Sequence, residues 1–112
     1  MRRAPPAVLL AALLAATAAD AGDIGRRNTL AQIDTAIRQV APVGGEVDPA
    51  LAYLDANHVE HSDNPDTRTV IAIVRGIRGG SFLIEKSASI RILYDARRRV
   101  TEVRVYADFT GP

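Results

Sequence analysis

Residues 82–110, FLIEKSASIRILYDARRRVTEVRVYADFT, decide the fold because apolar and polar side chains alternate along two runs within them. In the first run, Phe82–Tyr94, the even-numbered side chains are apolar except for Lys86, and the odd-numbered ones from Glu85 are mostly polar. In the second run the apolar row is odd-numbered: Val103, Val105, Ala107 and Phe109. A period of two indicates a strand with one buried and one wet face. We therefore predict one strand over Phe82–Tyr94 and another that begins near Arg99.

The segment between these two strands contains three consecutive arginines, Arg97 to Arg99. Because the alternation is regular on both sides, a short hairpin connection is required at Asp95–Arg98. We expect the arginines to be solvated at this bend and to need no partner. The alternative is that the triplet forms a binding patch.

A third strand is predicted over the apolar, β-branched run RTVIAIV, residues 68–74. A run that is apolar on both faces is typical of a central or doubly covered strand, so its register is open. The glycines at positions 76, 79 and 80 predict a turn after it. The preceding stretch EHSDNPDT, residues 60–67, is dense in turn-forming residues and predicts a loop.

Two helices are predicted before the strands. Thr29 (or Asn28) caps the first, and Thr29 with Gln32 fits a capping box. Its apolar stripe is Leu30, Ile33, Ile37 and Val40, and Pro42 with the glycine pair at 44–45 ends it. Asp48 caps the second helix and Pro49 suits its first turn. That helix places Leu51 and Leu54 on one face and ends near Asn57.

The predicted fold class is α+β, with two N-terminal helices packed on one face of a three-stranded antiparallel meander. We predict a single domain over residues 28–112 that follows a flexible lead-in at 22–27. The predicted core is Leu30, Ile33, Ile37, Val40, Leu51, Leu54, Ile71, Ile73, Ile90, Ile92, Val103, Val105 and Phe109.

The N-terminal residues 1–21 are typical of a secretory signal peptide, with a basic start, MRR, and the apolar run APPAVLLAALLAA. Small residues at Ala19 and Ala21 predict cleavage after Ala21, and Ala16 with Ala18 offers a second site. The alternative is an uncleaved N-terminal anchor. The chain has no cysteine, which excludes disulfides, thiolate catalysis and a lipid-anchor cysteine. We therefore expect a periplasmic or secreted protein without a stable membrane anchor after cleavage.

The charge of the mature part is divided between its two halves. Residues 22–66 carry three basic and eight acidic side chains, whereas residues 67–112 carry nine basic and four acidic ones. The two halves therefore attract each other, or the basic half meets an anionic partner.

Catalytic signatures are weak throughout the chain, so we expect neither an enzyme nor a cofactor. His58 and His61, with three nearby carboxylates, are weak candidates for a metal site. The stretch GIRGGS at residues 76–81 lacks the Lys-Ser/Thr ending of a phosphate-binding loop. The predicted wet face of the sheet carries Arg91, Arg104 and Tyr106, residue types that favour interfaces. We predict that this face binds a protein partner. An anionic lipid or glycan surface is the second alternative, and we do not expect nucleic-acid binding.

The stretches DPALAYLDANHVEHS (48–62) and ASIRILYDARRRVTEVRVYADFTGP (88–112) resemble small bacterial envelope proteins of the SmpA/OmlA type. The resemblance covers about residues 44–112 and implies an α-α-β-β-β layout in the cell envelope. We expect a non-enzymatic protein-interaction module. The alternatives are a small inhibitor of a secreted enzyme and a metal-responsive protein built around His58 and His61.

Overall fold

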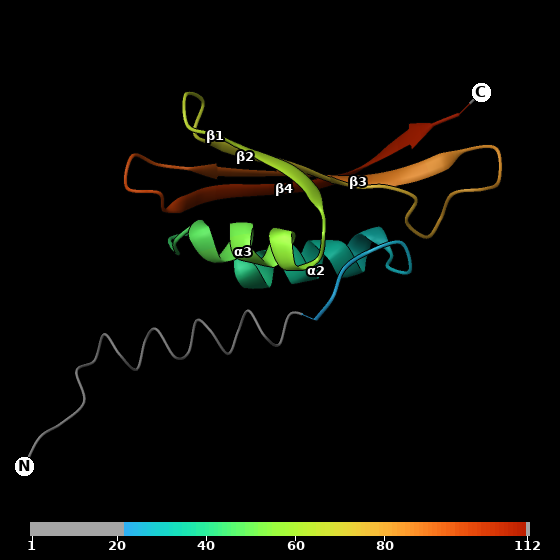
Figure 1. The fold of residues 1–112 in the computed structure, drawn as a ribbon, viewed down its shortest axis with the longest axis horizontal. Helices are drawn as coiled ribbons and strands as arrows, with labels where there is room; N and C mark the ends of the chain where they lie inside the picture. Colours follow the sequence, from blue (N-terminus) through green and yellow to red (C-terminus); the bar gives the residue numbers. More distant parts are fainter. Residues whose placement is uncertain (1–21, 112) are drawn as a thin grey trace, which may run out of the picture.

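The computed structural model describes residues 22–111 and shows an α+β fold. Helices α2 (Leu30–Val40) and α3 (Asp48–Ala56) precede four strands, β1 (Glu60–Asn64), β2 (Thr69–Val74), β3 (Glu85–Tyr94) and β4 (Val100–Thr110). The strands form one antiparallel sheet in the order β1-β2-β3-β4, and both helices lie against the same face of it (Figure 1). The predicted signal peptide and its cleavage site lie outside the described residues.

The sheet has four strands, so the prediction of a three-stranded meander is wrong. The extra strand, β1, lies in the stretch that was predicted to be a loop, and it pairs with β2 from Glu60↔Ile73 to Asn64↔Thr69. Its sequence, EHSDN, has no apolar side chain, because an edge strand is held by backbone hydrogen bonds on one side and contributes little to the core. The turn-forming residues mark only the bend that follows it.

Strand β2 faces the helices with Val70, Ala72 and Val74, which are all buried. The prediction that Ile71 and Ile73 belong to the core is therefore wrong: Ile71 is 40% exposed and Ile73 is half-buried. Residues 70–74 are apolar on both faces of the strand, so the pattern cannot select the inward face, and a shift of one residue exchanges the two faces.

Strand β3 begins at Glu85, three residues later than predicted. The N–H of Ser81 donates to the carbonyl of Ile84 at 2.8 Å, which closes a tight turn and keeps Phe82–Ile84 out of the sheet. At the same end of the sheet Phe109 is 63% exposed, so its assignment to the core is also wrong. Phe109 pairs with Lys86, and this pair lies beyond the buried part of the inner face.

Helix α2 begins as predicted. Thr29 is its N-cap, and the reciprocal bonds of a capping box join Thr29 and Gln32. Helix α3 differs in its cap: Val47 takes the N-cap position and makes no side-chain cap bond, and Asp48 is the first helical residue. The Asp48 carboxylate is therefore available for a contact outside the helix.

The core lies between the two helices and the inner face of the sheet. Seven residues of the predicted core are buried: Ile33, Ile37, Val40, Leu54, Ile90, Ile92 and Val103. Three more are half-buried and pack against the core: Leu30, Leu51 and Val105. Ile24 is also buried, and its N–H donates to the Asn57 Oδ1 at 3.0 Å. Ile24 therefore joins the segment 22–27, predicted to be a flexible lead-in, to the domain.

Candidate interaction surface

The face of the sheet that points away from the helices carries the predicted partner-binding residues. The pairing registers Ile71↔Arg91 and Arg91↔Arg104 place three side chains in one row across β2, β3 and β4. Ser89↔Tyr106 forms the adjacent row, in which Ile73 is the β2 member. We call this surface the outer face and define it by Ile71, Ile73, Ser89, Arg91, Arg104 and Tyr106.

Arg91 and Tyr106 are linked within the outer face. They are diagonal neighbours on adjacent strands, and the Nε of Arg91 donates a hydrogen bond to the Tyr106 hydroxyl at 3.2 Å. Tyr106 is 39% exposed. The bond orients both side chains across the strand pair, so the structure brings this predicted pair together.

Arg104 lies beside Arg91 and forms an ion pair with Glu102 on the same strand. The hydrogen bond from Arg104 lowers the pKa of the Glu102 carboxyl, and the same bond raises the pKa of the guanidinium. Both side chains are about half exposed, so water screens the pair and a partner's carboxylate can compete for Arg104.

Ile71 supplies an apolar contribution that the sequence pattern did not assign to this surface. Its exposed side chain stands next to Arg91, and Ile73 lies in the row of Tyr106. An apolar centre beside arginine and tyrosine matches the composition of protein–protein interfaces. The outer face therefore combines apolar area with charged hydrogen-bond donors.

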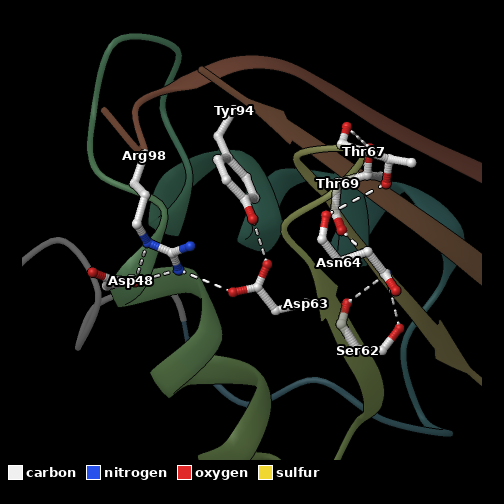
Figure 2. A network of polar contacts seen from close by, with 8 residues as sticks. All are labelled: Asp48, Ser62, Asp63, Asn64, Thr67, Thr69, Tyr94 and Arg98. Atoms are coloured by element: carbon white, nitrogen blue, oxygen red, sulfur yellow. Dashed lines mark hydrogen bonds and ion pairs between the residues drawn. The ribbon is translucent and has the colours of Figure 1, made fainter. Parts of the chain in front are cut away.

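We expected the three arginines at the bend to be solvated, but Arg98 contacts other side chains. Its Nη2 lies 2.7 Å from the Asp48 Oδ1 and 3.0 Å from the Asp63 Oδ2 (Figure 2). The guanidinium also lies over the Tyr94 ring, 4.9 Å from the centroid, and the Tyr94 hydroxyl donates to the Asp63 Oδ1 at 2.6 Å. We call Asp48, Asp63, Tyr94 and Arg98 the Arg98 network.

The Arg98 network ties the β3–β4 bend to the start of α3 and to β1. The hydrogen bond from Tyr94 holds the pKa of the Asp63 carboxyl below its usual range, and the Arg98 guanidinium lowers it further. Burial raises the pKa of Tyr94, and its bond to Asp63 adds to that rise. These contacts stabilise the fold.

The other two arginines of the triplet do not extend this cluster. Arg99 donates to the carbonyl of Gly44 at 3.2 Å, and Arg97 is exposed at the bend. The backbone there is a tight hairpin, closed by a 2.9 Å bond from the Arg98 N–H to the carbonyl of Asp95. The predicted hairpin is confirmed, and the three side chains have separate surroundings.

The candidate metal ligands His58 and His61 lie on different local structures. Helix α3 ends at Ala56, so His58 falls in a turn with φ of 55° and His61 falls on β1. His61 has its Nδ1 2.6 Å from the carbonyl of Val59 and its Nε2 3.2 Å from the Asp55 carboxylate. Within residues 22–111, no three His, Asp or Glu side chains lie close enough to share a metal ion.

Comparisons of the chain with protein-family models, curated proteins and solved structures found no match, so the resemblance to the SmpA/OmlA type stays a prediction. Among the helices of residues 22–111, none has the length and apolar character needed to span a bilayer.

Proposed function

We propose that this chain is a non-enzymatic interaction module that acts in the periplasm or outside the cell and binds a protein partner through the outer face. The proposal rests on the observation that the helices cover only one face of the sheet. Both helices lie on the inner face (Figure 1), and Arg91 and Tyr106 stand linked on the opposite face beside the exposed Ile71. Export rests on the sequence of residues 1–21.

The chemistry of the outer face favours a partner that presents carboxylates. Among residues 22–111, the hydrogen bonding of Arg91 uses only its Nε, which leaves its two Nη groups for an acceptor. Because a planar guanidinium binds a carboxylate with two parallel hydrogen bonds, Arg91 and Arg104 together fit a pair of acidic side chains. Ile71 would then pack against an apolar side chain of the same partner.

Charge reversal at the outer face tests the proposal. In a pull-down from an envelope extract, we expect Arg91→Glu and Arg104→Glu each to lower recovery of the captured protein by at least about tenfold, because a carboxylate replaces the donor. Recovery would be measured by quantitative mass spectrometry, with thermal unfolding of each variant as a check of folding.

Arg97→Glu is the matched control, because it makes the same charge change on the exposed hairpin bend. It should recover the partner as the parent does. The same proteins recovered in equal amounts by the parent and by both outer-face variants would refute the proposal. If the captured protein is an enzyme whose activity falls on binding, the module acts as an inhibitor.

A further inference from the structure

A second exposed surface lies at the end of the sheet, away from the outer face. It consists of Phe82, Leu83 and Ile84 in the β2–β3 connection, which are 96%, 58% and 44% exposed, and Phe109 near the end of β4, which is 63% exposed. Figure 1 shows this connection beside the C-terminal end of β4, at the right of the view. We call these four residues the apolar tip.

The apolar tip projects from a connection whose base is fixed. Ile77 is buried, and its N–H donates to the carbonyl of Lys86 at 2.8 Å. The N–H of Arg78 donates to the carbonyl of Asn28 at 3.0 Å. The turn at Ser81–Ile84 then carries the three apolar side chains outward. Contiguous large apolar side chains left in water are unusual in soluble domains and mark contact sites.

Cationic side chains surround the base of the apolar tip. Arg26, Arg78 and Lys86 line the hollow beneath residues 82–84, and Glu85 is the single acid among the described residues that line it. The Lys86 Nζ lies 5.8 Å from the centroid of the Phe109 ring. In the described part of the chain, none of these three cations forms an ion pair with a carboxylate.

Gly79 lies against the Lys86 side chain. Its φ is +111°, and a Cβ at this position would lie 2.9 Å from the Lys86 Nζ. At Gly79 the connection takes a backbone conformation that residues other than glycine rarely adopt.

We propose that the apolar tip inserts into the headgroup region of an anionic phospholipid bilayer, with Arg26, Arg78 and Lys86 on the lipid phosphates. Aromatic and aliphatic side chains enter the interface between headgroups and acyl chains, and nearby Lys and Arg add attraction to anionic lipids. A projecting apolar turn with three cations beside it complements such a surface without a matching pocket. Because only a few side chains enter the bilayer, the binding is weak and reversible. The outer face lies away from the apolar tip and therefore remains free for its protein partner.

A tryptophan reporter tests this inference, because the chain contains no tryptophan. The protein would be purified from cells with its N-terminus as it is after any processing there. Mass spectrometry would verify that all variants share one N-terminus. With vesicles of phosphatidylglycerol and phosphatidylethanolamine, Phe82→Trp emission should shift to shorter wavelength and be quenched by brominated acyl chains. Phosphatidylcholine vesicles should give little shift, and high salt should weaken the response. The control Tyr106→Trp, on the outer face, should not respond.

Vesicle sedimentation gives a second readout. Replacing both Phe82 and Leu83 with serine should lower the vesicle-to-water partition coefficient by at least about tenfold. Unchanged Phe82→Trp emission with anionic vesicles, or equal sedimentation of the double variant and the parent, would overturn the proposal. A blue shift that needs no lipid and grows with protein concentration would also overturn it, because a second copy would then cover the tip. A third outcome would overturn it as well: the double variant no longer captures a protein that the parent captures, and the emission of Phe82→Trp does not change with lipid.

Discussion

Replacing Ile90 with alanine should lower the free energy of unfolding by about 3 to 4 kcal/mol. Ile90 is fully buried on β3, faces the helices, and pairs with Ala72 on one side and Val105 on the other. Its removal deletes three methyl or methylene groups and leaves a cavity that the surrounding strands cannot fill. Urea unfolding followed by circular dichroism measures the change.

The matched control is Ile71→Ala, which deletes the same atoms from the neighbouring strand. Ile71 is 40% exposed on the outer face, so we expect a loss of less than about 1 kcal/mol. A loss at Ile71 equal to that at Ile90 would contradict the register of β2. It would instead support the inward placement of Ile71 that the sequence suggested.

The second large effect is expected at Asp63, the acceptor shared by Tyr94 and Arg98. Asp63→Ala should cost about 2 kcal/mol, because the buried Tyr94 hydroxyl and the half-buried Arg98 guanidinium both lose a hydrogen-bond partner. Asp66→Ala, at an exposed position in the next turn, is the control and should change stability by less than about 0.5 kcal/mol. Equal stability of the two variants would show that the Arg98 network is not formed.

The network also predicts a pH dependence. The folded-state pKa of Asp63 is depressed, so its contribution is complete above the unfolded-state pKa of about 3.9 and is lost as pH falls through the lower folded-state value. Parent stability should therefore fall towards that of Asp63→Ala below about pH 4. A difference between the two proteins that stays constant down to pH 2 would contradict the depressed pKa.

Local patterns were enough to predict the two helices and the β3–β4 hairpin. A capping box and a stripe of four apolar side chains set α2, and strict alternation set the inward rows of β3 and β4. The strand β1 was missed because it lies at an edge and is polar throughout. The face of β2 was missed because residues 70–74 are apolar on both faces and its one polar residue, Thr69, is buried, so no polar residue marks the solvent side.

Three of the outer-face residues followed from the same alternation, whereas Ile71 and Ile73 did not. Once the bend was placed at Asp95–Arg98, Arg91, Arg104 and Tyr106 had to share a face, and the structure places them as neighbours. The Arg98 network was out of reach, because it joins residues up to fifty positions apart through one guanidinium. No local pattern specifies that Arg98 turns towards α3 while Arg97 remains exposed.

Site-specific photo-crosslinking in cells tests the central claim most directly, because it reports which surface touches a protein partner. A benzoylphenylalanine at Tyr106 samples the outer face, and one at Thr35 samples the exposed side of α2 on the other side of the molecule. Our account predicts a discrete crosslinked protein from position 106 and none from position 35. A discrete crosslinked protein from position 35 and none from position 106 would contradict it.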